Sequence, residues 1–185
     1  QSQRGDRYRA EVGRLLAGGG AYRDYATTEE IQAERETAQR ERRRFLYSRR
    51  WMGKTEAEIA EFEAQGRQSV VRLKMPRDGV CEFEDQIRGH MEFEWALEQD
   101  QVVQRSDGSC LYHLASAVDD HDFRITHVIR GDEWLPSAPK HVQLFEAVGL
   151  SVPHFAHLPV LVGSDQKKLS KRTGGASALE YKEKG

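Results

Sequence analysis

The sequence contains no asparagine and only two cysteines, Cys81 and Cys110, which are not in a CxxC spacing. It therefore has neither an N-linked glycosylation site nor a disulfide framework, and a reducing, cytoplasmic setting is expected. No apolar run approaches the roughly 18 residues of a membrane helix, and no apolar signal segment lies near the N-terminus. The Walker phosphate loop and the GxGxxG dinucleotide fingerprint are both missing. The protein is thus expected to be soluble and not to associate with membranes.

The 185 residues are enough for one domain and a small second one, and 38% of them are hydrophobic. The net charge is only -2, but the charges are unevenly distributed. Residues 35–54 hold eight Lys or Arg against two Glu, whereas residues 82–100 hold seven acids against one Arg. Such opposite patches could orient a polyanion, or they could be two solvated faces.

The first half of the chain predicts helices followed by strands. Apolar residues at helical spacing precede Gly18, so the sequence opens in mid-helix, which predicts that it was processed or belongs to something longer. Thr27 and Thr55 are each followed three residues later by Glu, the capping-box pattern, which predicts helices over 28–46 and 56–65. Further on, apolar residues alternate with charged ones over 71–75 and 91–97, the period of a strand with one wet face.

The second half predicts an α/β unit, which begins after a turn at Asp107-Gly108. A helix over 111–118 leads to the strand ITHVIRG, a second helix begins near Ser137, and the apolar run FAHLPVLV follows. Strand, helix and strand with short connections predict parallel pairing. Ligands in such sheets bind beyond the carboxyl ends of the strands, where IRGDEW and KKLSKR both lie.

Two sets of residues at those strand ends could bind a ligand. Arg130 could hold a carboxylate through two parallel hydrogen bonds, Glu133 could accept from ribose hydroxyls, and Trp134 could pack on a base. An ordinary surface ion pair is the alternative for this stretch. In KKLSKR, Lys168 and Lys171 are flanked by glycines and could close over a phosphate chain, whereas a solvated basic turn is the alternative.

Two further groups of residues have side chains that can bind metal ions. The run DDHD at 119–122 and the pair His154 and His157 have suitable side chains, but neither has a third partner in the sequence. Turn chemistry and strand-end packing are the preferred interpretations, so no metal site is predicted.

Several motifs together carry a family resemblance. KLSKR at 168–172 resembles the KMSKS signature of class I aminoacyl-tRNA synthetases in its glutamate-family form. QSQR, SVVRLKMPRDG, LYHLASAVDD and HVIRGDEWLPSAPKH resemble glutamyl-tRNA synthetase, in the order that this family uses. The resemblance implies an α/β fold: an incomplete Rossmann-type class I synthetase catalytic domain with an inserted mixed α/β connective domain.

The resemblance also implies a division of the chain. Residues 1–20 correspond to the end of the first Rossmann half, and residues 21–108 to the connective insertion that receives the tRNA acceptor end. Residues 109–174 correspond to the second Rossmann half with its KMSKS-type loop, and residues 175–185 to the start of a stem-contact region. The His-x-Gly-His half-site and the anticodon-binding region are not among these residues, so the 185 residues alone are expected not to aminoacylate.

The implied activity is ligation of L-glutamate to the acceptor end of tRNA(Glu). ATP and glutamate give glutamyl adenylate and pyrophosphate, and the glutamyl group then passes to the terminal adenosine of the tRNA. ATP is expected to enter with Mg²⁺ as a substrate. Zinc is not predicted, because neither cysteine lies near Ala21-Tyr22, where some relatives bind it. A monomer is expected.

The family's functional residues fall on particular positions of this sequence. Tyr112, Ser116 and Arg130 match residues that contact glutamate. The ATP-binding positions are Glu133, Trp134, Leu161 and Lys171. The catalytic positions are Lys168, Ser170 and Lys171, of which Lys171 is the signature lysine that stabilises the phosphates in the transition state.

Three other interpretations stay open at this point. The chain could belong to the truncated paralogue that attaches glutamate to a modified base of tRNA, glutamyl-queuosine tRNA synthetase. It could belong to glutaminyl-tRNA synthetase. It could also be a tRNA-binding module that keeps the insertion and has lost the chemistry.

Overall fold

The computed structural model describes residues 1–162 and 182. The predicted catalytic residues Lys168, Ser170 and Lys171 therefore lie outside the described residues. The helices are α1 (Gly5–Ala17), α2 (Thr28–Arg40), α3 (Glu56–Ala64), α4 (Tyr112–Asp122) and α5 (Ala138–Ala147), with 3₁₀ turns η1 (Trp95–Leu97) and η2 (Asp132–Ser137). The strands are β1 (Ala21–Asp24), β2 (Val70–Leu73), β3 (Val80–Asp85), β4 (Gly89–Glu94), β5 (Val102–Gln104), β6 (His127–Gly131) and β7 (His154–Leu158).

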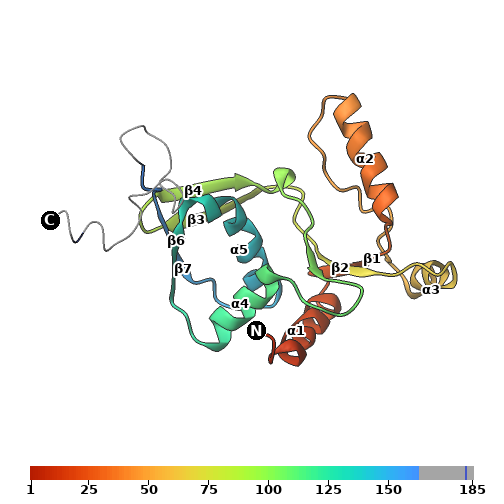
Figure 1. The fold of residues 1–185 in the computed structure, drawn as a ribbon, viewed down its shortest axis with the longest axis horizontal. Coiled ribbons are helices and arrows are strands. Elements are labelled where there is room, and N and C mark those ends of the chain that lie inside the picture. The colour runs from red at the N-terminus through yellow and green to blue at the C-terminus, as the bar shows by residue number, and fades with distance from the viewer. Residues whose placement is uncertain (163–181, 183–185) are drawn as a thin grey trace.

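The strands form two sheets (Figure 1). The first has the order β1-β2-β5 and is antiparallel. The second has the order β4-β3-β7-β6, in which β3 and β4 form an antiparallel hairpin while β3 and β6 both run parallel to β7. The parallel pairing predicted for the second half of the chain is thus confirmed, and the α/β fold with it.

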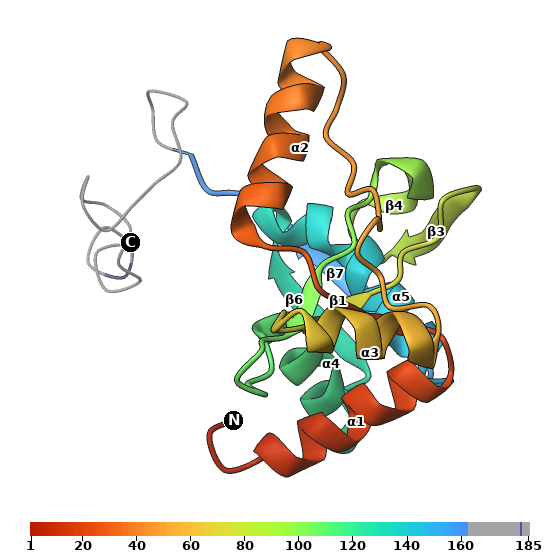
Figure 2. The ribbon, with the colours of Figure 1, turned by 90° about the vertical axis from the view of Figure 1, so that its right-hand side faces the viewer.

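One continuous apolar core joins the two sheets. It takes Leu15 from α1, Leu73 from β2, Leu114 from α4 and Phe145 from α5, and Phe155 from β7 completes it. The β3–β4 hairpin falls within the range assigned by resemblance to the connective insertion, yet β3 pairs with β7 of the second half. Insertion and second half therefore share a sheet and a core, while α2 projects away from this body (Figure 2).

The predicted helix over 28–46 is shorter than expected. Its start is confirmed by the complete capping box at Thr27, whose hydroxyl accepts from Glu30 N–H at 3.3 Å. The helix ends at Arg40, and Arg42 has φ of 53°, a left-handed conformation that a helix cannot continue through. The arginine-rich stretch that follows is an extended loop, which returns to the body where Tyr47 is buried.

The strand predictions were wrong in their limits. The strand expected over 91–97 is β4, and its last part is instead the 3₁₀ turn η1, in which Trp95 is buried. The run FAHLPVLV forms β7 only as far as Leu158, because Pro159 has no N–H to donate to a neighbouring strand. No helix among the described residues is long and apolar enough to cross a membrane.

Candidate active site at the carboxyl ends of β6 and β7

Three predicted ligand-binding residues come together where β6 ends. Arg130 is the penultimate residue of β6, Trp134 lies in the η2 turn that follows, and Tyr112 is the first residue of α4. The rings of Tyr112 and Trp134 are 5.9 Å apart between centroids. Both side chains are exposed, at 51% and 42%. Ser116 follows Tyr112 by one helical turn and therefore lies on the same side of α4.

The guanidinium of Arg130 is held on three sides. Its Nε–H donates to Nε2 of His157 at 2.9 Å, and its Nη1 lies 3.4 Å from Nδ1 of His141. The guanidinium carbon lies 5.5 Å from the ring centroid of Phe155. Burial lowers the pKa of Arg130, and the nearby Tyr112, Asp120 and Asp85 act against this shift. Nη2 is buried and has no hydrogen-bond acceptor among the described residues.

His157 is fixed in turn by Asp85 at the end of β3. Its ring Nδ1 lies 2.6 Å from Asp85 Oδ2, and its backbone N–H donates to Oδ1 at 3.1 Å. Oδ1 also accepts from the backbone N–H groups of Ile87 and Arg88. Burial alone would raise the pKa of Asp85, but these hydrogen bonds, led by that of His157, lower it to about 2. Asp85 is therefore a buried carboxylate at neutral pH.

A pair of hydrogen-bonded histidines lies on the side of Arg130 away from His157. Nε2 of His141, on α5, is 2.9 Å from Nδ1 of His113, on α4. Burial, and after it the positive charge of Arg130, lowers the pKa of His141 from 6.5 to about 3. Burial also lowers the pKa of His113. Both rings are therefore neutral at physiological pH.

Two further predicted ligands, Glu133 and Leu161, lie after β6 and after β7, respectively. Glu133 folds back on Gly131, where a Cβ atom would lie 2.1 Å from its Oε2. Arg88 of the β3–β4 turn pairs with Asp132 at the start of η2 and so braces this turn. Leu161 lies beyond β7 and is 70% exposed.

Two carboxylates of the run at 119–122 form ion pairs with arginines of the N-terminal segment. Arg4 donates to Asp119 and pairs with Asp122, while Arg7 binds both oxygens of Asp122 at 3.0 Å. These carboxylates thus hold the N-terminal turn and α1 against the end of α4. Within residues 1–162, no group of three His, Cys, Asp or Glu side chains could hold a metal ion.

Sequence reasoning missed Asp85, His113 and His141 as parts of this site, and for His157 it preferred strand-end packing over a metal site without naming Arg130 as its partner. Arg130 and His157 are register partners in the parallel β6–β7 pair. This register is a signal for that contact only once the strand ends are known, and the run FAHLPVLV alone puts the end of its strand four residues too late, at Val162. Asp85 carries no such signal, because it lies 72 residues before His157.

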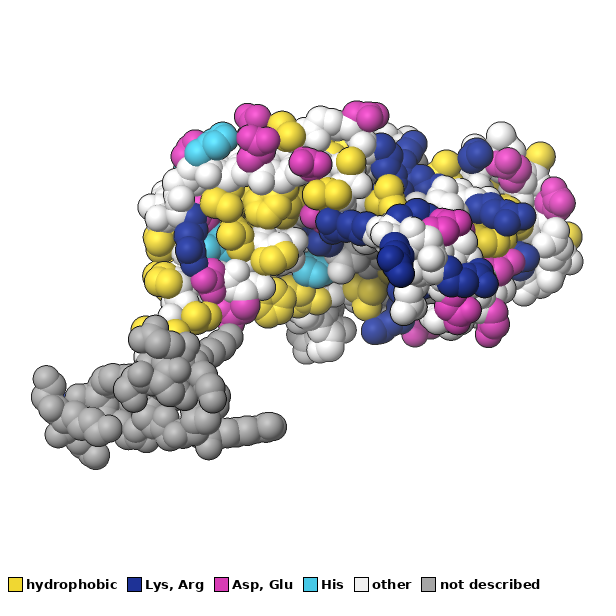
Figure 3. Space-filling model, turned by 90° about the horizontal axis from the view of Figure 1, so that it is seen from above, with side chains coloured by type: hydrophobic (Ala, Val, Ile, Leu, Met, Phe, Trp, Pro, Cys, Tyr) yellow, Lys and Arg dark blue, Asp and Glu magenta, His cyan; other side chains and the backbone are white. Residues whose placement is uncertain are grey.

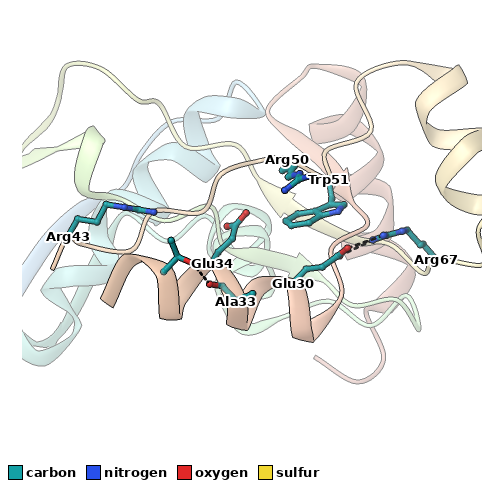
Figure 4. Close-up of a pocket in the computed structure, with 8 residues that line it drawn as sticks. Glu30, Ala33, Glu34, Arg43, Arg50, Trp51 and Arg67 are labelled. Atoms are coloured by element: carbon teal, nitrogen blue, oxygen red, sulfur yellow. Dashed lines mark hydrogen bonds and ion pairs between the residues drawn. The ribbon is translucent and has the colours of Figure 1, made fainter. Parts of the chain in front are cut away.

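A basic surface lies at the other end of the molecule (Figure 3). It is formed mainly by the loop that follows α2, since α2 itself carries four Glu against two Arg, whereas acidic side chains gather over the β3–β4 hairpin. Arg35, Arg42, Arg44 and Arg50 have no carboxylate partner within residues 1–162. A hollow of about 570 Å³ between α2 and this loop is lined by Arg43, Arg50, Trp51 and Arg67, among other residues (Figure 4). The Arg50 guanidinium lies 5.3 Å from the Trp51 ring centroid, so one face of the indole carries a cation.

Known proteins resemble this chain along its whole length. The family described as tRNA synthetases class I (E and Q), catalytic domain, matches residues 1–185. Glutamate–tRNA ligase of Protochlamydia amoebophila is 44% identical over 185 residues, which are 100% of this chain and 37% of that protein. Glutamate–tRNA ligase 1 of Caldanaerobacter subterraneus is 40% identical over 100% of this chain and 38% of its own length.

Solved structures show the same similarity to glutamate–tRNA synthetases. The glutamate–tRNA synthetase of Elizabethkingia anophelis has a TM-score of 0.84 and 36% identity over 96% of this chain and 38% of that chain. A glutamate tRNA ligase from Elizabethkingia meningosepticum, solved in complex with its amino acid, also has a TM-score of 0.84. The chain spans a little over a third of the length of these relatives. It belongs to the class I tRNA synthetases for glutamate and glutamine, as part of their catalytic domain.

Proposed function

We propose that this chain is part of the catalytic region of a glutamate–tRNA ligase. The observation that carries the proposal is the buried Nη2 of Arg130, which has no acceptor in the described part of the chain and lies in the neighbourhood of Tyr112. A buried donor without a partner costs about 1–3 kcal/mol. A carboxylate oxygen of glutamate would remove that cost and pair with the guanidinium charge.

The roles proposed for the individual residues are those that the family resemblance assigns to their positions. Arg130 holds a carboxylate of glutamate, and Tyr112 and Ser116, on one side of α4, border the same substrate. Trp134 offers a ring face to the adenine, and Glu133 accepts from the ribose hydroxyls. Leu161 contacts the nucleotide from the segment after β7. Lys168, Ser170 and Lys171 hold the phosphates, and ATP brings Mg²⁺ with it as part of the substrate.

The reaction has two steps. A carboxylate oxygen of glutamate attacks the α-phosphorus of ATP, the bond to the β-phosphate oxygen breaks, and pyrophosphate leaves. A hydroxyl of the terminal adenosine of tRNA then attacks the glutamyl carbonyl, and AMP leaves with the bonding electrons. Cations at Lys168 and Lys171 offset the charge that develops on the phosphates in the first step.

The basic surface around α2 is the proposed docking face for the tRNA acceptor end. Its unpaired arginines bind phosphates without reading sequence, and Trp51 offers a flat ring for a base. The segments 1–20, 21–108, 109–174 and 175–185 keep the roles given above as part of this proposal. A monomer in the cytoplasm is the expected state.

The test is ATP–pyrophosphate exchange, with tRNA present, by the complete protein in which these residues occur. Exchange that requires glutamate and is not supported by glutamine supports the proposal, and the attachment of glutamate to the 3′ end of tRNA completes it. Exchange that requires glutamine, or glutamate attached to a base within the tRNA, would instead favour one of the two related synthetases. Exchange with neither amino acid contradicts the proposal.

A further inference from the structure

A continuous chain of polar side chains crosses the site from β3 to α4. It runs from Asp85 through His157 to Arg130, and from there through His141 to His113. Five separate elements contribute one residue each. Asp85, His141 and His157 are 2%, 2% and 0% exposed, so water does not compete for these hydrogen bonds. Arg130 stands in the middle of the chain.

The chemistry of arginine sets the direction of every hydrogen bond in this series of side chains. A guanidinium has donors only, so Nε2 of His157 and Nδ1 of His141 must both present lone pairs to Arg130. His157 therefore carries its proton on Nδ1, where it donates to Asp85. His141 carries its proton on Nε2, where it donates to Nδ1 of His113. Each ring is neutral and in one defined tautomer.

We propose that Asp85, His157, His141 and His113 are positioning residues for glutamate binding, which hold the Arg130 guanidinium so that Nη2 stays available for the substrate carboxylate. This inference rests on the proposed function. None of the four residues is required to touch glutamate or ATP. They act by giving Arg130 two acceptors in fixed places and by excluding the tautomers that would turn an N–H toward it.

A purely structural role makes a different prediction. Asp85 also binds two backbone N–H groups of the β3–β4 turn, so its loss would loosen the fold as well as the site. A general loosening would raise the KM values for glutamate and ATP together and lower the unfolding temperature. A positioning role raises the KM for glutamate alone, because ATP is held by other residues.

The decisive experiment compares two amides at position 157 in the complete protein. His157→Asn keeps a donor close to where Nδ1 faces Asp85 but is too short to reach Arg130. His157→Gln is longer, and its amide oxygen can take the place of Nε2 as the acceptor for Arg130 Nε–H. We expect His157→Asn to raise the KM for glutamate about tenfold or more. His157→Gln should recover most of that loss, with the KM for ATP within about twofold of the parent in both variants.

A second pair of variants tests His113, the half-buried residue at the α4 end of this series of hydrogen-bonded side chains. His113→Asn keeps an acceptor near Nδ1 for His141, whereas His113→Leu removes it. His113→Leu should raise the KM for glutamate about threefold or more, and His113→Asn should not. If the variants at position 157 do not fold, the variants at position 113 decide whether the histidines position Arg130 for glutamate. His127→Asn is the matched control, because His127 lies on the same strand as Arg130 but is exposed, and its ring contacts Thr126 and His154 rather than Arg130.

The outcomes are distinguishable. Equal increases in both KM values with a lower unfolding temperature, or no change in the KM for glutamate in either pair, overturn the positioning role while the ligase activity stands. Absence of glutamate-dependent exchange in the unmodified protein overturns the proposed function and this inference together.

Discussion

The carboxylate of Glu133 occupies the space that a side chain at position 131 would need: an added Cβ at Gly131 would lie 2.1 Å from Oε2 and 2.8 Å from Cδ of Glu133. The backbone itself does not demand glycine there, because φ is -68° and ψ is 151°, values open to any residue. The glycine is therefore needed for the position of one side chain.

Replacement of Gly131 by alanine should displace Glu133 without unfolding the protein. The clash is with the far end of a side chain that can rotate away, so the stability should change by less than about 1 kcal/mol. Because Glu133 is a proposed ATP ligand, the KM for ATP should rise severalfold while the KM for glutamate stays the same. Steady-state exchange kinetics measure both. Gly13→Ala on α1, where no atom lies within 4 Å of the new Cβ, is the control, and an unchanged KM for ATP would remove Glu133 from the nucleotide site.

The stability of the protein should decline as the pH falls from about 6.5 toward 3, because of His141. The folded-state pKa of His141 is lowered to about 3, so the unfolded chain binds the extra proton throughout this window. Each pH unit then removes up to about 1.4 kcal/mol from the free energy of unfolding. Urea titrations at pH 7, 6 and 5 measure the slope.

His141→Gln should make that slope shallower, since glutamine does not titrate. The groups that face His141 are Arg130, His113, Lys140 and His157. His113, whose pKa is also lowered by burial, adds to the loss of stability in the same direction. Equal slopes in the parent and His141→Gln would show that His141 does not carry the effect.

Much of the second half of the chain could be predicted, because its signals are local. Helical periodicity, a proline in the first turn of α5 and short connections were enough for the β6–α5–β7 order and its parallel pairing. The pairing of β3 with β7 could not be predicted, because alternation of apolar residues shows that a strand has a buried face but does not name its neighbour. The hydrogen bonds of the histidines were missed for the same reason: a polar residue within a helix or strand pattern does not show which side chain it contacts.

The end of α2 shows a second limit of prediction. The residues after Arg40 are good helix formers, so their propensities favour a longer helix. The chain leaves the helix because the loop makes tertiary contacts that propensity does not include. Tyr47 and Arg49 are two of these, and both bind buried carboxylates.

Replacement of Arg49 by alanine should destabilise the protein by about 3 kcal/mol or more. Arg49 donates to buried Asp100 at 2.8 Å and also binds the carbonyl of Met75, and its loss leaves Asp100 with fewer partners. Arg49 adopts φ of 61°, a conformation that costs a non-glycine residue about 1–2 kcal/mol. Arg49→Gly should therefore be less destabilised than Arg49→Ala by about 1 kcal/mol. Urea unfolding of both variants measures the free energy lost with the Arg49 contacts and the part of it that comes from the left-handed backbone. A larger loss of stability in the glycine variant than in the alanine variant contradicts this interpretation.

Replacement of Arg50 by alanine should weaken the binding of tRNA without changing glutamate-dependent exchange in its absence. Arg50 has no carboxylate partner within residues 1–162 and lies over Trp51, so a phosphate contact there would release about one counterion. The slope of log affinity against log salt should fall by about one. Filter binding at several salt concentrations measures it, with Arg9→Ala as a control, because Arg9 pairs with Asp6 on α1, away from the α2 loop. A slope that stays the same would remove the α2 loop from the docking face.

Replacement of Lys171 by alanine should lower the rate of adenylate formation about 10²–10³-fold, the usual effect of removing one preplaced charge from a transition state. Because the phosphates gain charge only as pyrophosphate departs, the loss should appear in kcat for exchange more than in the KM for ATP. The affinity for tRNA should hardly change, since the basic surface around α2 is a separate part of the chain. Lys182→Ala, another cation of the same C-terminal segment, is the control for a general loss of positive charge. An exchange rate that survives in Lys171→Ala would mean that the Arg130 site binds glutamate but that the phosphates are held by other groups.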